Sequence, residues 1–221
     1  FDKNFEEFKR KNYIKFFSPT SMVEYSKRIK KIVTPLLESH HVKNSLGEII
    51  SENKLKQLRI AETEKYAHVT YFFNGGIEDS FDGEDRVLIP SPRVETYDTK
   101  PEMAAFELTS ELVDRISKKN YDFIVTNFAN TDMVGHTGNF SATIKAVETL
   151  DNCLGNLYDV CKKNGYTLIV TSDHGNADMM FDYNKDTPCT THSLNPVPFI
   201  ICESYDFSSK KGKLSDIAPT I

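Results

Sequence analysis

Apolar residues recur at two different spacings along most of the chain, and the two spacings alternate. Short runs of β-branched and aromatic residues predict buried strands at RVLIP (86–90), FIVTNF (123–128), TLIVT (167–171) and VPFIIC (197–202). Between them, apolar residues three or four apart predict a helix that buries Ala105, Leu108, Leu112 and Ile116. A second helix, over about residues 140–163, is predicted to bury Val147, Leu150, Leu154, Leu157 and Cys161. This alternation predicts an α/β fold, a mostly parallel sheet with helices on both faces.

Capping patterns predict where three helices begin or end. Ser45-Leu46-Gly47-Glu48 has the spacing of a capping box, so a helix of roughly ten residues is expected to follow it. Thr99-Lys100-Pro101-Glu102 repeats the pattern before the second helical run, with proline in the first turn. Gly165 is the predicted stop of the long helix.

The first 37 residues have a different texture. Two runs, FEEFKRKNYIKFF (5–17) and MVEYSKRIKKIV (22–33), alternate apolar and charged residues as strands do, but they are too few to form a core. A linker is expected near residues 34–43. The chain is therefore predicted to contain two parts, residues 1–37 and residues 38–221.

Composition narrows the functional classes. Among 221 residues the net charge is −5 and the charges of both signs are interspersed, so neither nucleic acid nor an anionic membrane is an expected partner. No apolar run is long enough to cross a membrane. The four cysteines lack metal-site spacing and are expected to be reduced and mostly buried, as in a cytoplasmic protein: Cys153, Cys161, Cys189 and Cys202.

Aspartate and histidine residues lie directly beside three of the predicted strands. Asp132 and His136 follow the strand at 123–128, Asp173 and His174 follow the next strand, and His192 precedes the last one. Because ligands bind beyond the carboxyl ends of strands in open α/β sheets, these side chains are expected to share one crevice.

Mixed carboxylate and imidazole donors suit Mn²⁺, Zn²⁺ or Fe²⁺ better than Ca²⁺. Five such donors are too many for one open catalytic site, whereas two ions use them all. Nearby glycines are expected to let the backbone approach ions or phosphate: Gly135, Gly138 and Gly175. Either Asp/His pair alone is more typical of an ordinary turn than of a metal site, and only their combination favours a metal site. The other three histidines are expected to lie away from the strand ends, in solvent: His40, His41 and His68.

A second feature is LRIAETEKYAHVTYFFNGG, residues 58–76. Lys65 has two interpretations there. It is either a surface charge at the start of a helix or a positive charge offered to a phosphate near the metals.

Several ordered motifs resemble one enzyme family. They are the segment 58–76, RVLIPSPRVETYDTKPEMAAFE, NFANTDMVGHTGN, KAVETLDNCLG, TSDHGNADMM, THSLNPVP and SDIAPT. Together, from about residue 44 to the end, they resemble the C-terminal portion of cofactor-independent phosphoglycerate mutases, of the alkaline phosphatase superfamily. Residues 1–37 resemble the tail of that family's inserted transferase domain.

The resemblance implies a function and a role for each site residue. Family members interconvert 3-phosphoglycerate and 2-phosphoglycerate in glycolysis and gluconeogenesis, with two divalent ions, most often Mn²⁺, and a phosphoserine intermediate; Zn²⁺ and Co²⁺ are alternatives. Matched by motif, Asp132, His136 and His192 would hold one ion. Asp173 and His174 would contribute to the other, and Lys65 would face the transferring phosphoryl group.

The chain also departs from the family pattern. The family's Asp-Gly metal ligand and its nucleophilic serine lie in a stretch that precedes the transferase domain, and neither has a match here. Ser172 and Ser141 do not match that serine and are interpreted as structural. This chain is therefore expected to be inactive alone and to need two partners, the missing phosphatase stretch and the transferase domain. Its fold is expected to be incomplete, with a strand-wide gap in the sheet beside residues 123–128 or 167–171.

Two other functions remain open. A phosphatase or phosphodiesterase of the same superfamily would share the metal core but release its product. A non-catalytic metal-binding module would bind ions without turnover.

Overall fold

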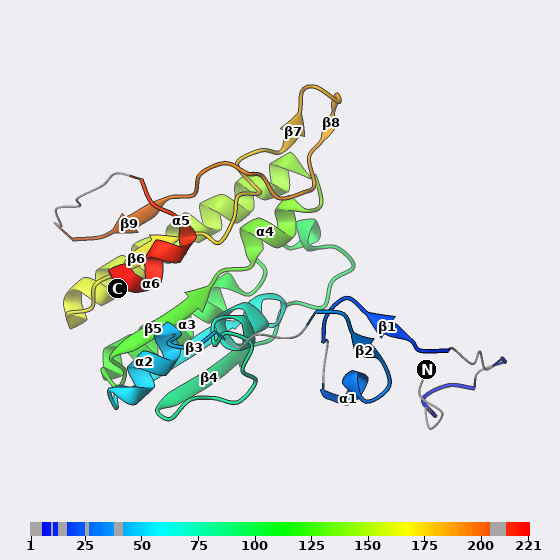
Figure 1. The fold of residues 1–221 in the computed structure, drawn as a ribbon. Helices are drawn as coiled ribbons and strands as arrows, with labels where there is room; N and C mark the ends of the chain where they lie inside the picture. The colour runs from blue at the N-terminus through cyan, green and yellow to red at the C-terminus, as the bar shows by residue number, and fades with distance from the viewer. Residues whose placement is uncertain (1–5, 10, 13–16, 25–26, 38–41, 204–210) are drawn as a thin grey trace. The chain divides into compact units, whose positions relative to one another are not determined.

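The computed structural model describes residues 6–9, 11–12, 17–24, 27–37, 42–203 and 211–221 (Figure 1). The chain divides into two compact units, residues 1–41 and residues 42–221. Part of the predicted linker, together with His40 and His41, lies outside the described residues. In the described part of the chain, no helix has both the length and the apolar composition that a membrane crossing requires.

The first unit contains little regular structure. Strand β1 (Thr20–Ser21) pairs in parallel with β2 (Thr34–Pro35), and the short helix α1 (Lys27–Lys30) lies between them in sequence. The second run was predicted as strand-like, and that prediction is wrong where the run contains α1. The part of the first run that the structure describes contains no strand. Among the described side chains of this unit only Val33 is a buried hydrophobic residue, so its described part contains no hydrophobic core.

The second unit alternates strands and helices as predicted. Its longer elements are α2 (Leu46–Glu52), β3 (Gln57–Glu62), β4 (Glu84–Ile89), α3 (Ala105–Lys118), β5 (Phe123–Asn127), α4 (Asn130–Gly135) and α5 (Phe140–Asn164). The remaining strands are β6 (Ile169–Thr171), β7 (Phe181–Asp182), β8 (Thr187–Pro188) and β9 (Phe199–Ile201). Short helical segments complete the unit: η1 (Thr63–Lys65), η2 (His68–Phe72), η3 (Tyr97–Thr99), η4 (Leu214–Asp216) and α6 (Ile217–Thr220).

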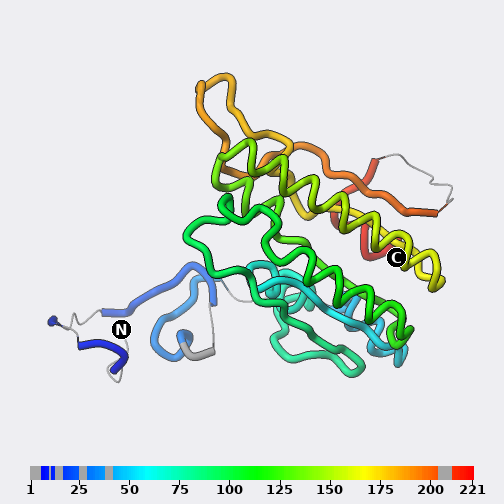
Figure 2. The backbone as a smooth tube through the Cα atoms, turned by 180° about the vertical axis from the view of Figure 1, so that it is seen from behind, coloured from blue at the N-terminus to red at the C-terminus, as the bar shows by residue number. Residues whose placement is uncertain are grey.

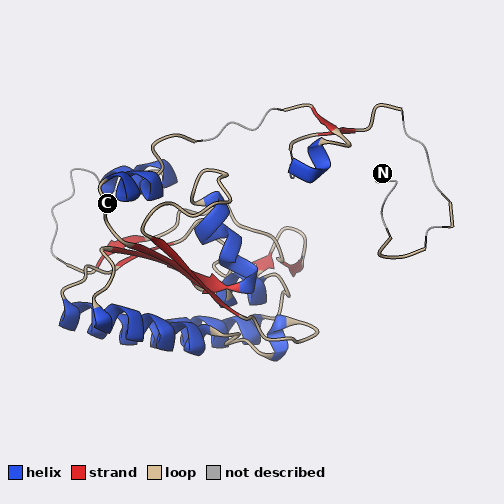
Figure 3. Cartoon of the chain, turned by 90° about the horizontal axis from the view of Figure 1, so that it is seen from below, coloured by secondary structure: helices blue, strands red, loops and turns tan. Residues whose placement is uncertain are grey.

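A three-stranded parallel sheet lies at the centre of this unit, in the order β4-β3-β5. All six residues of β3 are buried because a strand in the middle of a covered sheet has no face toward water. On one face, Leu58 and Ile60 pack with side chains of α3 and α5 such as Leu108 and Leu157. Figure 3 shows the long helix as a layer beneath the strands, with further helices on the opposite side. The predicted α/β fold with helices on both faces is confirmed.

The opposite face of β3 carries a buried arginine. Arg59 is fully buried, with its guanidinium 4.4 Å from the ring centre of Phe73 and 5.6 Å from that of Phe123. It also donates a hydrogen bond of 2.5 Å to Gln57. Burial lowers the pKa of Arg59 to about 10, although the carboxylate of Glu84 acts in the opposite direction. The Arg59 guanidinium thus occupies the space between the sheet and the segment around Phe73, where an aliphatic side chain would be usual.

Strands β6 and β9 form a separate antiparallel pair, with Val170 opposite Ile200. The apolar pattern of residues 197–202 was interpreted as part of a parallel sheet, and for β9 that interpretation is wrong. Strand β5 pairs only with β3, and β6 only with β9. Within the residues that the structure describes, no strand bridges β5 and β6, which agrees with the gap expected beside these two strands.

Of the two predicted capping boxes, the first caps a helix and the second does not. The side chain of Ser45 accepts a hydrogen bond from the amide of Glu48, so α2 begins as predicted. Glu48 reaches back to the amide of Asn44 rather than to that of Ser45. Helix α3 begins only at Ala105 and has no side-chain cap, while Thr99 instead donates to the carbonyl of Thr96. The predicted capping role of Thr99 is therefore wrong.

Helix α5 buries a different set of residues from the predicted one. It lies beside α3, as seen from behind in Figure 2, and ends at Gly165, which has a positive φ of 78°. Its buried residues are Ala142, Thr143, Ala146, Cys153, Leu157 and Cys161. Val147, which was predicted on the buried side, is 46% exposed. Ala142 and Ala146 pack with Val134 of α4, whereas Leu157 and Cys161 pack in the cluster that contains α3 residues such as Leu108.

Glu62, the last residue of β3, is a fully buried carboxyl group. Its Oε2 accepts hydrogen bonds from the Ser91 hydroxyl at 3.1 Å and from the Ala104 amide at 3.2 Å. Its Oε1 has no partner among the described residues. Burial raises the pKa of Glu62 to about 7, even though these two hydrogen bonds act in the opposite direction. The Glu62 side chain thus links the end of β3 to the start of α3, and its burial makes the ionised form of the carboxyl unfavourable.

Replacement Glu62→Gln is expected to stabilise the protein above pH 7 and to have no effect below about pH 4.5. The folded state retains the proton up to a pKa of about 7, whereas the unfolded state loses it near 4.5, so the wild-type free energy of unfolding falls as pH rises through this window. The difference between the folded and unfolded pKa values corresponds to roughly 3 kcal/mol of unfolding free energy. Urea unfolding at pH 4.5 and pH 8 measures it. The control Glu52→Gln, at an exposed position, should leave the pH dependence unchanged.

Candidate metal centre

The candidate site residues are delivered by segments that follow the strands. Strand β3 leads into η1, which carries Lys65, and β5 leads into α4, which carries Asp132 and is followed by His136. Asp173 and His174 follow β6, and His192 lies between β8 and β9. Because β3 and β5 are parallel, their carboxyl ends reach the same edge of the sheet.

Asp132, His136 and His192 converge on one point. Asp132 Oδ1 lies 3.2 Å from His136 Nε2 and 3.4 Å from His192 Nε2, and the two nitrogens are 3.1 Å apart. Ligands about 2.0–2.2 Å from one divalent ion lie roughly 2.9–3.5 Å from one another in tetrahedral or octahedral geometry. The three donor atoms therefore have the spacing of three ligands on one face of a single ion.

The ring of His136 is oriented by a backbone carbonyl. Its Nδ1 lies 2.8 Å from the carbonyl oxygen of Thr190. Since a carbonyl oxygen only accepts hydrogen bonds, Nδ1 carries the proton, and the lone pair of Nε2 is directed toward Asp132 and His192. A partner of this kind on the remote ring nitrogen is typical of metal-ligating histidines.

His174 and Asp173 extend the same cluster. The ring of His174 stacks on that of His192, with centroids 3.6 Å apart and an interplanar angle of 18°. Ligand atoms of Asp132, His174 and His192 lie within 4.8 Å of one another. Asp173 Oδ2 is 3.6 Å from His174 Nε2. The structure thus brings all five residues together as one continuous group, without a visible division into two ligand sets.

Lys65 is buried and forms an ion pair with Asp132 Oδ2. The other carboxylate oxygen of Asp132, Oδ1, faces His136 and His192, so the aspartate is used on both sides. Burial alone raises the pKa of such a carboxyl, but hydrogen bonds from Lys65 and Asn176 and the charge of Lys65 hold the pKa of Asp132 below its ordinary value. Of the two interpretations of Lys65, a surface charge at a helix start is excluded.

Asn176 belongs to the centre, although sequence reasoning assigned it no role. Its Nδ2 donates to Asp132 Oδ1 at 2.6 Å and to the Asp132 carbonyl at 3.2 Å. A side chain on Gly135 would meet the Asn176 amide, so glycine is needed there for the approach of Asn176. The available signal was its place in the SDHGN motif, two residues after His174.

His68 lies where the sequence indicated. Its side chain is exposed, and it lies in the helical segment η2 rather than at a strand end. Partial burial and the charge of Lys65 lower the pKa of His68, while the carboxylates of Asp173 and Asp132 act in the opposite direction.

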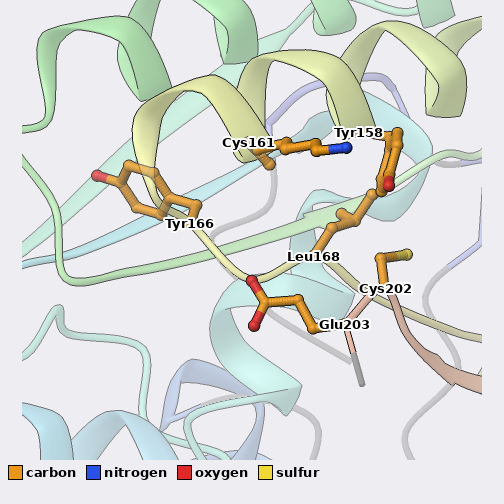
Figure 4. A pocket seen from close by; sticks show the side chains of 7 residues that line it. Tyr158, Cys161, Tyr166, Leu168, Cys202 and Glu203 are labelled. Carbon is orange, nitrogen blue, oxygen red and sulfur yellow. The ribbon is translucent and has the colours of Figure 1, made fainter. Parts of the chain in front are cut away.

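Ser172 and the pocket near the end of α5 are separate from the candidate ligands. The Ser172 hydroxyl donates to the His174 carbonyl at 2.6 Å, which is a structural contact of the loop. Figure 4 shows a pocket of about 160 Å³ that lies elsewhere, between the end of α5 and the end of β9. None of the five candidate ligands lines it. Its lining residues are Tyr158, Cys161, Lys162, Tyr166, Leu168, Cys202 and Glu203.

Comparison with known proteins assigns the chain to a family. A model described as the metalloenzyme superfamily matches residues 13–221. The match covers both the sheet and every candidate ligand. The chain therefore belongs to the metalloenzyme superfamily.

Within that superfamily, similar proteins carry the name 2,3-bisphosphoglycerate-independent phosphoglycerate mutase. One, from Ehrlichia canis (strain Jake), is 49% identical over 97% of this chain. Another, from Gracilaria tenuistipitata var. liui, is 60% identical over 81% of this chain. The alignments cover 43% and 36% of those two relatives, so the chain spans less than half of their length.

A solved structure shares the fold. Phosphoglycerate mutase of Leishmania mexicana, crystallised at low cobalt concentration, aligns with a TM-score of 0.75 and 33% identity. The alignment covers 82% of this chain and 35% of that protein. The predicted resemblance to phosphoglycerate mutases and the alkaline-phosphatase-like fold are confirmed, and the family supports the use of divalent metal.

Replacements Asp132→Ala and His192→Ala are each expected to weaken Mn²⁺ binding by more than the ~10–100-fold typical of losing an outer partner, because each removes a donor atom. Isothermal titration of the 221-residue chain measures the affinity. Asp182→Ala is the matched control. The carboxylate of Asp182 accepts hydrogen bonds from the backbone amides of Asn184 and Lys185 and forms an ion pair with Lys185, all within the β7–β8 hairpin. Equal effects from all three replacements would contradict the assignment.

Proposed function

We propose that this chain is the C-terminal, metal-binding part of a phosphoglycerate mutase that needs no bisphosphoglycerate. The intact cytoplasmic enzyme would interconvert 3-phosphoglycerate and 2-phosphoglycerate in glycolysis and gluconeogenesis. The observation that carries the proposal is the 3.1–3.4 Å triangle of Asp132, His136 and His192 beside a buried lysine. The names of the similar proteins support the substrate class.

The centre is proposed to hold two divalent ions, with Mn²⁺ as the first choice and Zn²⁺ or Co²⁺ as alternatives. Asp132, His136 and His192 would be ligands of one, and Asp173 and His174 would contribute to the other. Two adjacent divalent ions favour a nucleophilic oxygen and balance charge on a transferring phosphoryl group. The three-donor triangle fits the first ion, and the exposed carboxylate of Asp173 offers oxygen ligands for the second.

Lys65 is proposed as the catalytic residue that this chain contributes. Its ammonium group is held in a buried position by Asp132, at the edge of the sheet where the candidate ligands converge. A fixed positive charge there would balance the charge of a phosphoryl group during transfer. Placement by a hydrogen-bonded partner matters because a preorganised donor needs no rearrangement during the reaction.

The nucleophile is proposed to come from outside these residues. A serine oxygen would take the phosphoryl group from the substrate, the bond from phosphorus to the substrate oxygen would break, and that oxygen would take up a proton. Transfer back to the neighbouring hydroxyl of the glycerate would reverse the step. Residues 1–37 would be the tail of a transferase domain that holds the glycerate, and residues 38–221 the main part of the metal-binding domain.

The intact protein that contains this chain is expected to convert 3-phosphoglycerate into 2-phosphoglycerate with Mn²⁺ and without bisphosphoglycerate, whereas residues 1–221 alone should give no turnover. Phosphorus NMR of the reaction separates the two isomers from free phosphate. Free phosphate as the main product would identify a hydrolase instead. Stoichiometric metal binding without either product would indicate a non-catalytic module.

In the intact enzyme, Lys65→Met is expected to lower kcat by roughly 100- to 1,000-fold, the range for loss of one charge-stabilising group. The bound metal, counted by atomic emission, should stay unchanged because Lys65 is not a proposed ligand. Lys185→Met is the matched control, because that lysine is highly exposed and pairs only with Asp182 in the β7–β8 hairpin. Unchanged kcat in Lys65→Met would contradict the proposed role.

A further inference from the structure

A set of hydrogen bonds closes the loop between the two stacked histidines. We call the participating residues, Gly175, Asp178, Ser193 and Asn195, the loop clasp. Ser193 N donates to the carbonyl of Gly175 at 2.9 Å, and the two residues form an isolated antiparallel bridge. Each directly follows one of the histidines, His174 or His192, in the sequence.

Asp178 supplies the side-chain half of the clasp. The Ser193 hydroxyl lies 3.0 Å from Oδ1 and 2.8 Å from Oδ2 of this carboxylate, and Asn195 Nδ2 donates to Oδ2 at 2.5 Å. The Ser193 hydroxyl also accepts from the amide of Asn195 at 3.4 Å. Hydrogen bonds to an ionised acceptor are stronger than neutral ones, so the carboxylate is the strongest acceptor in the clasp.

The clasp excludes any side chain at position 175. A Cβ atom on Gly175 would collide with the Ser193 hydroxyl and would lie 2.7 Å from Asp178 Oδ1. Ser193 is itself buried, at 6% exposure. The close approach of the two segments is therefore a packed arrangement rather than a loose surface contact.

His192 directly precedes one residue of the clasp, Ser193. Between His174 and His192 the chain leaves the body of the unit as the β7–β8 hairpin (Figure 1, orange) and then returns. The clasp joins the two ends of this excursion. Gly175 and Ser193 each lie one residue from a histidine, and the rings of these two histidines stack with centroids 3.6 Å apart.

We propose that Asp178, through Ser193 and Asn195, is a positioning residue that holds His192 against His174 and Asp132 for binding of a divalent metal. The inference rests on the proposed metal centre and deepens it. Asp178 is not among the residues whose donor atoms cluster within 4.8 Å, which are Asp132, His174 and His192, and its oxygens accept hydrogen bonds within the clasp. Its effect on the metal acts only through the geometry of His192.

The test is Mn²⁺ titration of the 221-residue chain carrying Asp178→Ala, with His192→Ala and Asp182→Ala measured alongside. Asp178→Ala is expected to lower Mn²⁺ affinity by about 10–100-fold, the range for partners that orient a metal ligand. Asp178→Asn keeps one acceptor oxygen and should lose less. Asp182→Ala removes a turn carboxylate of the same kind from the neighbouring hairpin and should leave the affinity unchanged.

A second readout separates positioning from general stability. Co²⁺ absorption bands report the coordination geometry of the ion, so Asp178→Ala should change their position and intensity while metal-free thermal unfolding stays close to that of Asp182→Ala. Asn195→Ala removes one hydrogen bond at an exposed position and should give a smaller change in the same direction, which keeps the test open if Asp178→Ala does not fold.

The outcomes distinguish the two proposals. Wild-type Mn²⁺ affinity and Co²⁺ bands in Asp178→Ala and Asn195→Ala, with affinity lost in His192→Ala, would overturn the clasp inference and leave the metal centre in place. Unchanged affinity in His192→Ala as well would overturn the metal centre itself. A lower unfolding temperature with unchanged affinity and spectrum would show that the clasp is only structural and would also overturn the inference.

Discussion

The carboxylate of Asp132 is the interaction on which the site depends. One oxygen takes the buried ammonium of Lys65, and the other faces two imidazole nitrogens and the Asn176 amide. Such a group is costly to bury alone, and its four neighbours make it tolerable. Because these neighbours come from η1, from the end of α4, from the loop after β6 and from the loop between β8 and β9, a single side chain joins every segment of the centre.

The sequence was sufficient to predict this convergence but not its supporting contacts. The parallel strands β3 and β5 share a carboxyl edge, which brings Lys65 and Asp132 together, whereas His174 arrives from the separate β6–β9 pair. The hydrogen bond from Asn176 arises from a close approach to Gly135, which no local pattern encodes.

The errors in the predicted fold have related causes. An apolar run marks a buried strand without stating its direction, so the antiparallel pairing of β9 was not visible. Helix α5 carries apolar residues on more than one side, and periodicity alone did not show that Ala146 rather than Val147 is buried, packed with Val134 of α4. In both cases the decision is made by the neighbour against which the element packs. Such information is distributed over distant parts of the chain.

The closed base of the β7–β8 hairpin bears on protein engineering. Since its base is closed by Gly175 and Ser193, the tip near Asn184 and Lys185 is separated from the histidines. Lengthening a flexible loop costs only about 0.6 kcal/mol per doubling of its length. This tip is therefore a place where the chain can be lengthened, or an epitope or fluorescent label inserted, without moving the candidate metal ligands.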